Sequence, residues 1–347
     1  MSMKELSMDR ICRKSYNERD LYTIRGKGMT LQQLKYLVTV AECGSISEAA
    51  QKLFISQPSL SAAIQNLEKE MGVTAFSRSS KGVVITREGE ELLAYSRMLL
   101  EQADIMQEHF GKDKNRTPKF SVSCQHYSFA VNAFVDLIKE YGQDAYDFSL
   151  RETQTYEIIE DVAHMRSEIG ILFLNDFNEK VITKILKSNE LEFHDLFVAK
   201  PHVFISRRHP LADRQIITNE ELESYPYLSF EQGEHNSFYF SEEILSTLDS
   251  RKDILVSDRA TLFNLLIGLN GYTICSGVIN EELNGPNIVA IPLDVDDYME
   301  IGYITHNRVT PGRFAGLYIE ALKRRVGVPV PKVSTREPIT RIPVSDR

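Results

Sequence analysis

Residues 44–71 carry the pattern that most constrains how this chain folds: two short amphipathic helices separated by a tight turn. The second helix has an apolar side at the spacing of a buried helical face, formed by Leu60, Ile64, Leu67 and Met71. Its opposite side is small and polar, with Pro58, Ser59, Ala62, Gln65, Asn66 and Lys69. This division predicts a helix-turn-helix, because a recognition helix packs inward while its outer side enters the major groove of DNA.

The segments on either side of these helices predict a winged arrangement. A helix is expected from residue 31 to about residue 42, and Gly44 and Gly72 stand where the first and third helices should end. Between residues 77 and 87, Arg78, Lys81 and Arg87 are interspersed with Ser, Gly and Val. We expect a β-hairpin wing there, whose cations meet DNA phosphates.

The net charge of -9 is the main objection to a nucleic-acid partner. Between residues 29 and 110, seven Lys and Arg residues stand against ten Asp and Glu residues, so this part is also acidic. Only charges near the duplex exchange for counterions, however. Six of the ten acids follow residue 87, in the helix after the wing, which weakens the objection without removing it.

A long helical pattern runs from residue 87 to about residue 110, with an apolar seam that Gln102 interrupts. The seam contains Leu92, Tyr95, Leu99, Met106 and Phe110. Two interpretations are open: a core helix packed on its own domain, or a dimerising linker helix whose broad apolar surface a partner covers. The charged segment 111–119, which contains Pro118, predicts a hinge.

From residue 120 the pattern changes to short strands alternating with helices, which predicts an open, largely parallel sheet. The predicted strands include residues 120–123, 148–151, 169–174, 227–230, 253–257 and 272–275. The predicted helices are residues 129–141, 156–166, 241–248, 260–269 and 313–325. The fold class is therefore α/β with an N-terminal all-α winged helix-turn-helix.

Several other classes of protein are disfavoured. No apolar run reaches the roughly 18 residues of a membrane span, and the N-terminus lacks the apolar core of a signal peptide. The four cysteines, Cys12, Cys43, Cys124 and Cys275, show no CxxC spacing, and no P-loop, HExxH, GxSxG or Rossmann glycine pattern occurs. We expect a cytoplasmic protein without a membrane partner, metal, cofactor or catalytic residues.

Two long motifs make the chain resemble the LysR-type transcriptional regulators. The segment AAQKLFISQPSLSAAI (residues 49–64) and the wing AFSRSSKGVVITREG (residues 75–89) follow the family pattern, and the wing keeps Phe76, Arg78, Thr86 and Gly89. A looser likeness in the remainder extends the resemblance over roughly residues 29–325. It implies a DNA-binding regulator with a periplasmic-binding-protein-like effector domain of two lobes, forming a homodimer or homotetramer on double-stranded operator DNA.

The resemblance divides the chain into seven segments. These are a disordered N-terminal extension (1–28), the winged helix-turn-helix (29–88), a dimerising linker helix (89–110), a hinge (111–119), lobe I (120–190 and 296–325), lobe II (191–295) and a Pro-rich tail (326–347). The crossovers between lobes are expected near Leu191 and Val295.

The resemblance also implies roles for single residues. The expected DNA contacts are Ser56, Gln57, Pro58, Ser59, Ser61, Gln65, Arg78 and Lys81. Two positions depart from the pattern, because Ala62 stands where relatives often have Arg and Lys81 replaces a frequent Arg. A Lys presents a point charge in place of the bidentate guanidinium of Arg. We therefore expect recognition of DNA shape to contribute more to affinity here.

A small-molecule effector of unknown identity is expected in the cleft, outside the carboxyl ends of the strands. The candidates are Ser123, Cys124, Gln125 and His126 after the first strand and, across the cleft, Ser229, Phe230, Glu231 and Ser276. Donors at a helix start favour an anionic or carbonyl group. Helix capping alone would account for about half of these residues.

Two alternatives compete with this interpretation. Cys124, near the expected cleft, or Cys275 would make the chain a redox-sensing regulator, although apolar neighbours of Cys275 favour an ordinary buried thiol. The chain would otherwise be an enzyme or a solute-binding protein, but both of these leave the helix-turn-helix without a use.

Overall fold

The computed structural model describes residues 28–79, 82–110, 117–142, 145–235, 237–247, 250–279 and 285–327. The chain divides into two compact units, residues 1–104 and 105–347. Most of the predicted N-terminal extension, hinge and tail fall outside the described residues, as does Lys81. No helix in the described part of the chain is long and apolar enough to span a membrane.

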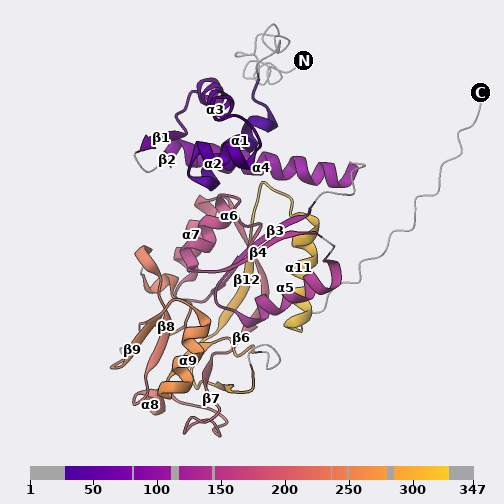
Figure 1. Cartoon of the computed structure of the whole chain (residues 1–347). Helices are drawn as coiled ribbons and strands as arrows, with labels where there is room; N and C mark the ends of the chain where they lie inside the picture. The colour runs from indigo at the N-terminus through magenta and orange to yellow at the C-terminus, as the bar shows by residue number, and fades with distance from the viewer. Residues whose placement is uncertain are drawn as a thin grey trace, which may run out of the picture. The chain divides into compact units, whose positions relative to one another are not determined.

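The first unit is the predicted winged helix-turn-helix (Figure 1). Helices α1 (Leu31–Cys43), α2 (Ile46–Lys52) and α3 (Gln57–Met71) precede the hairpin of β1 (Phe76–Ser79) and β2 (Gly82–Ile85), and α4 (Arg87–Phe110) follows. The strands pair antiparallel, with Phe76 opposite Ile85. The three helices, the hairpin and the start of α4 share one core, whose fully buried members include Leu37, Leu60, Leu67 and Leu93.

Local signals explain where the first three helices begin and end. Thr30 and Gln33 form a capping box at α1, and the Ser56 hydroxyl accepts the Ser59 N–H at the start of α3. Gly44 and Gly72 follow α1 and α3 in the left-handed conformation, as predicted.

The wing is fastened to α4 by two residues of the sequence motif. The Thr86 hydroxyl donates to the carbonyl of Thr74 and accepts the N–H of Gly89, at 2.5 and 2.9 Å. A Cβ on Gly89 would lie 2.1 Å from the carbonyl oxygen of Ala75, so only glycine allows this approach.

The second unit contains two five-stranded sheets. The lobe I sheet has the order β4 (Asp147–Glu152), β3 (Lys119–Cys124), β5 (Ile169–Leu174), β12 (Met299–His306) and β6 (Leu191–Ala199). Helices α5 (Ser128–Tyr141) and α11 (Arg313–Arg325) pack together on one face, and α6 (Thr155–Ala163) and α7 (Glu179–Ser188) cover the other (Figure 1). Both faces of the sheet are therefore buried, which explains why all six residues of β5 are apolar or small.

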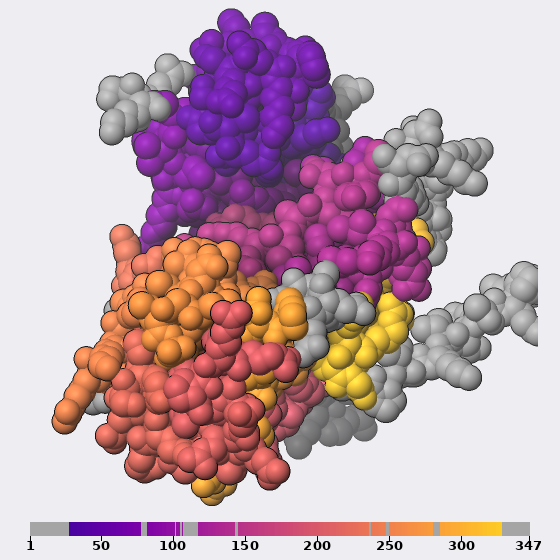
Figure 2. All heavy atoms as spheres, turned by 60° about the horizontal axis from the view of Figure 1, so that its bottom comes forward, coloured from indigo at the N-terminus to yellow at the C-terminus, as the bar shows by residue number. Residues whose placement is uncertain are grey.

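The lobe II sheet has the order β11 (Ile288–Pro292), β7 (His202–Ser206), β10 (Tyr272–Cys275), β8 (Tyr227–Phe230) and β9 (Asp253–Val256). Helix α9 (Arg259–Leu269) packs on β7, β8 and β9, and the short α8 (Asn219–Leu222) precedes β8. In the space-filling view the salmon and orange residues of lobe II gather in one mass (Figure 2).

Three sequence expectations need correction, and one helix was missed. The crossover lies after Ala199 and not near Leu191, because β6 pairs with β12 in the lobe I sheet. Helix α7 was not predicted. Residues 241–247 do not form the predicted helix. They form bends and turns after a short 3-10 helix (Phe238–Phe240), because the side chains of Glu242 and Glu243 are buried. Met71 is partly exposed and not buried, because α3 ends at that residue.

Candidate functional site

The outward side of α3 is a continuous polar surface in the first unit. Leu60, Ile64 and Leu67 face the core, whereas Pro58, Ser59, Ala62, Gln65, Asn66 and Lys69 are exposed. Ser56 and Gln57 are exposed at its N-terminal end, and Ser61 is half-buried. The Gln57 carbonyl oxygen accepts the Ser47 hydroxyl of α2 at 2.9 Å, which orients this side chain.

The wing lies next to α3 along the chain, in the same unit. Arg78 is on β1, opposite Val83 of β2, while Lys81 falls outside the described residues. This surface combines a helix with an exposed small-residue face and a hairpin that carries a cation, which is the geometry of a major-groove reader.

A pocket of about 40 Å³ lies between the two lobes of the second unit. Lobe I contributes the residues that follow β3, with His126 and Ser128. Lobe II contributes Phe230 at the end of β8, Arg259 at the start of α9, and the turn that carries Glu242 and Glu243. We call this cavity the effector pocket.

One contact between the lobes joins His126 to Glu242. The Glu242 carboxylate accepts the backbone N–H of His126 at 2.9 Å, and His126 Nδ1 lies 2.9 Å from the same oxygen. The imidazole also stacks on the Phe230 ring, with centroids 3.8 Å apart. Both side chains of the pair are nearly buried, 6% and 5% exposed. Burial lowers the pKa of His126, but the Glu242 carboxylate outweighs this, and the pKa is raised overall.

A second ion pair crosses the cleft between Arg259 and Glu152. Arg259 also donates to the Ser128 hydroxyl at 3.1 Å, at the first residue of α5. Burial raises the pKa of Glu152, although Arg259 opposes this. The pocket therefore holds the Arg259 guanidinium and the His126 imidazole, each already paired with an internal carboxylate.

Glu243 lies beside Glu242 and behaves differently. It is 2% exposed, and its carboxyl oxygens accept the Phe230 N–H at 3.0 Å and lie 3.1 Å from the Ser241 hydroxyl. Burial, with the neighbouring Glu242 carboxylate, raises the pKa of Glu243 to about 8. This carboxyl is therefore largely protonated at neutral pH.

A third contact joins the two lobes at the start of α6. The Gln232 carbonyl oxygen accepts the Thr155 N–H at 3.1 Å, and the Tyr156 ring stacks on His235. The Thr155 hydroxyl in turn accepts the Gln125 amide at 2.6 Å.

Two of the eight predicted effector residues, His126 and Phe230, line the effector pocket. Gln125 is engaged with Thr155 and Tyr127 beside the cleft, while Ser229 and Ser276 are buried and Glu231 is exposed. Ser123 points into lobe I, where its hydroxyl donates to Asp161 and lies 2.8 Å from Ser167. Cys124 belongs to the lobe I core. Neither side chain lines the effector pocket, because both are buried within lobe I.

Sequence reasoning missed the charged residues Glu242, Glu243 and Arg259 that line the pocket, and also Glu152 and Gln232, which make contacts between the lobes beside it. Except for Glu243, their partners in the other lobe lie far away in the sequence, 116 positions in the case of His126 and Glu242. Short-range spacing therefore carried no signal for them.

The structure disfavours the redox alternative. Burial raises the pKa of the Cys124 thiol well above its usual value, and desolvation also raises that of Cys275. A thiol in this state holds little of the reactive thiolate. No group of three or more candidate metal ligands occurs among the described residues.

Family models match two parts of the chain. Residues 31–90 match the model described as "Bacterial regulatory helix-turn-helix protein, lysR family", and residues 122–327 match the "LysR substrate binding domain". The second match alone spans more than half of the chain.

Individual relatives agree with these models. The uncharacterized HTH-type transcriptional regulator YnfL of Escherichia coli is 29% identical over 58% of this chain and 65% of its own length. The HTH-type transcriptional activator CmpR of Synechocystis is 24% identical over 78% and 86%. The chain covers less than two thirds of the length of YnfL and of several other curated relatives. Full-length OxyR from Pseudomonas aeruginosa has a similar fold, with a TM-score of 0.64 at 20% identity over 86% of this chain and 96% of that one.

Proposed function

The chain belongs to the LysR family, and we propose that it is a sequence-specific DNA-binding transcriptional regulator controlled by a small molecule. The observation that carries this proposal is the exposed face of α3. Small and polar side chains stand there on a helix that Leu60 and Leu67 fix to the core. Such a helix can enter the major groove, with Ser56, Gln57, Pro58, Ser59, Ser61 and Gln65 toward the bases. Arg78 and Lys81 of the wing would contact phosphates.

The effector pocket suggests the chemical class of the small molecule. Glu242 places a carboxylate on the backbone N–H and imidazole of His126, just before α5. An effector with its own carboxylate would compete with Glu242 for these donors. Because Glu242 belongs to lobe II and His126 to lobe I, such an exchange would change how the lobes are held. A ligand shifts a conformational equilibrium only through unequal affinity for the two states.

A homo-oligomer completes the proposal. Tyr95, Leu99 and Met106 are exposed at 44%, 45% and 59% along one side of α4, with Gln102 between them. This spacing suits a helix-helix seam with a partner copy. A dimer, or a tetramer built from two dimers, would present two or four copies of α3 to a repeated operator in the cytoplasm. We expect no enzymatic activity.

The test is DNA binding by the purified full chain to its own upstream intergenic DNA, across a salt series. We expect saturable binding that resists competitor DNA and weakens steeply with salt, and that weakens further in Arg78→Ala. Parallel titrations with small mono- and dicarboxylates examine the effector class. Failure to retain the upstream DNA at low salt, with or without these carboxylates, would contradict the proposal.

A further inference from the structure

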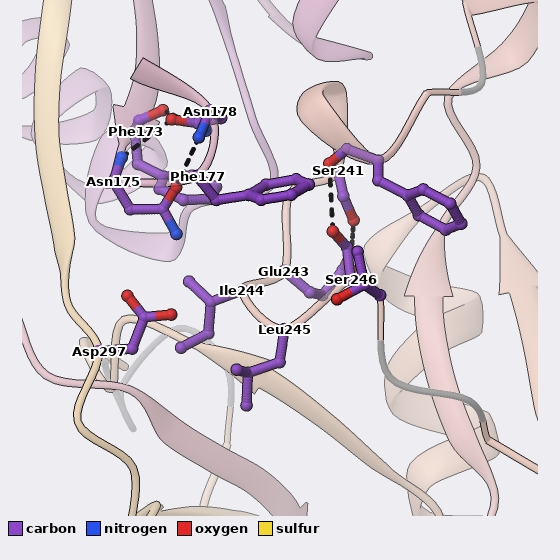
Figure 3. Close-up of a pocket in the computed structure, with 12 residues that line it drawn as sticks. Phe173, Asn175, Phe177, Asn178, Ser241, Glu243, Ile244, Leu245, Ser246 and Asp297 are labelled. Carbon is purple, nitrogen blue, oxygen red and sulfur yellow. Dashed lines mark hydrogen bonds between the residues drawn. The ribbon is translucent and has the colours of Figure 1, made fainter. Parts of the chain in front are cut away.

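A second cavity, of about 150 Å³, lies between the lobes beside the connection from β11 to β12 (Figure 3). Lobe I lines it with the end of β5 and the turn before α7, lobe II with residues 238–247, and the connection contributes Asp297. Among the described residues, Glu243 alone lines both this cavity and the effector pocket. We call it the hinge cavity, after the connection between the lobes and not after the predicted hinge at residues 111–119.

The charges of the hinge cavity are of one sign. Its described lining contains two carboxyl groups, Glu243 and Asp297, and no Lys, Arg or His. Glu243 is largely protonated at neutral pH for the reasons given above, so Asp297 is the anionic group. One Asp297 oxygen accepts the N–H of Tyr298 at 2.7 Å. The other accepts no hydrogen bond from the residues that the structure describes.

Asn175 supplies an unused donor. Its side chain is almost buried, with the residue 5% exposed, and its carbonyl oxygen accepts the N–H of Asn178 at 3.1 Å. No described residue accepts a hydrogen bond from its Nδ2, which points into the cavity on the side of Asp297 (Figure 3). Nδ2 is therefore an N–H donor that is open to the cavity, and a bound acceptor would pair with it.

The remaining lining combines apolar side chains with the polar residues Asn178, Ser241, Ser246 and Thr247. Phe177, Ile244 and Leu245 point into the cavity (Figure 3), and the Phe177 ring is held by stacking on Tyr239 with centroids 4.8 Å apart. Aromatic faces attract ammonium groups as well as apolar surface. An engineered cavity of about 150 Å³ binds benzene, so this volume suits a molecule of a few carbon atoms.

We propose that the hinge cavity is a second ligand site, which binds a small organic ammonium ion that also carries a carbonyl oxygen. The ammonium lies on Asp297, the carbonyl accepts from Asn175 Nδ2, and the apolar part packs on Phe177 and Leu245. The site is distinct from the effector pocket and of opposite charge preference. Its ligand touches both lobes, so it is placed to act on the same lobe arrangement as the effector.

Calorimetry with three matched probes tests this site on the full chain, at about pH 6.5, where an α-amino group is protonated. Valinamide has the ammonium, the carbonyl and an apolar body, isovaleramide lacks the ammonium, and valine has a carboxylate in place of the carboxamide. We expect valinamide to bind at least ten times tighter than either of the others. Equal binding of valinamide and isovaleramide would overturn the proposal.

Variants locate the binding. Asp297→Asn keeps the shape and removes the charge, and should weaken valinamide binding about tenfold, whereas the same change at exposed Asp213 should leave it unaltered. Asn175→Ala should weaken it by a smaller factor, and circular dichroism checks that each variant folds. Binding that falls in His126→Gln but not in Asp297→Asn would place the amine in the effector pocket and contradict the hinge site.

Discussion

The Glu242 carboxylate of lobe II accepts the backbone N–H of His126 in lobe I at 2.9 Å, and the same oxygen lies 2.9 Å from His126 Nδ1. An internal anion thus occupies the donors that a bound anion would use. The ring of His126 is fixed between this carboxylate and Phe230. The pair therefore links the protonation of one side chain to the contact between two lobes.

Replacing Glu242 with Gln should lower the pKa of His126, because the carboxylate is what raises it. A histidine with a raised folded pKa stabilises the fold below its unfolded pKa of about 6.5, and this contribution is lost as pH rises through the folded pKa. The His126 resonance titrated by NMR in both proteins measures the shift. An unchanged His126 pKa in Glu242→Gln would contradict the role of this carboxylate.

Glu243→Gln should stabilise the protein at alkaline pH. The folded pKa of Glu243 is about 8, so between about pH 4.5 and 8 the unfolded chain releases a proton that the folded chain keeps, and stability falls as pH rises. Since one pKa unit is worth about 1.4 kcal/mol and the pKa rises from 4.5 to about 8, we expect Gln to raise the free energy of unfolding by up to about 4 kcal/mol at pH 8. Urea titrations from about pH 5 to 8 measure it. Parallel profiles for the two proteins would show that Glu243 ionises normally.

Ser123→Ala should affect stability and not effector binding. The Ser123 hydroxyl donates to the buried Asp161 carboxylate at 2.6 Å inside lobe I. Its loss should cost about 1.5 to 3 kcal/mol, the range for hydrogen bonds to charged groups. Ser188→Ala, at an exposed helix end, serves as the control for urea denaturation. A large loss of affinity for carboxylate ligands without a loss of stability would show that Ser123 takes part in effector binding.

Leu99→Glu should weaken self-association, because it introduces a charge into the exposed seam of α4. Burial of a leucine at such a seam is worth about 2 kcal/mol per copy, which makes at least a tenfold loss of dimer affinity the expected result. Sedimentation equilibrium measures it. The conservative Leu99→Met should keep the dimer, and unchanged association in Leu99→Glu would place the interface elsewhere.

The sequence predicted those elements whose signals are local. Strands 169–174, 227–230 and 272–275 and the helix 313–325 were predicted with the bounds that the structure shows, because each combines a clear apolar pattern with a distinct end. Residues 241–248 were predicted as a helix, whereas residues 241–247 form bends and turns. Long-range contacts decide their conformation: Glu242 binds His126, Glu243 binds the Phe230 N–H, and Leu245 adopts a left-handed backbone.

The two candidate sites differed in how far the sequence could predict them. The surface of α3 is one amphipathic helix, so periodicity alone separates its exposed face from Leu60 and Leu67. The effector pocket is built from loops that meet only after both lobes have folded. Position at a strand end indicated His126 and Phe230, but it did not distinguish them from Ser123, whose hydroxyl faces the interior.

The most direct test of the central claim is whether Gln57 of α3 carries sequence discrimination. Anisotropy titrations should compare upstream DNA with scrambled DNA for the native chain, for Gln57→Ala, and for Gln51→Ala on the exposed side of α2 as the control. We expect Gln57→Ala to lose about tenfold or more on the upstream DNA, at about 1.4 kcal/mol per factor of ten, and little on scrambled DNA. Equal losses on both DNAs, or none, would contradict recognition through the exposed face of α3.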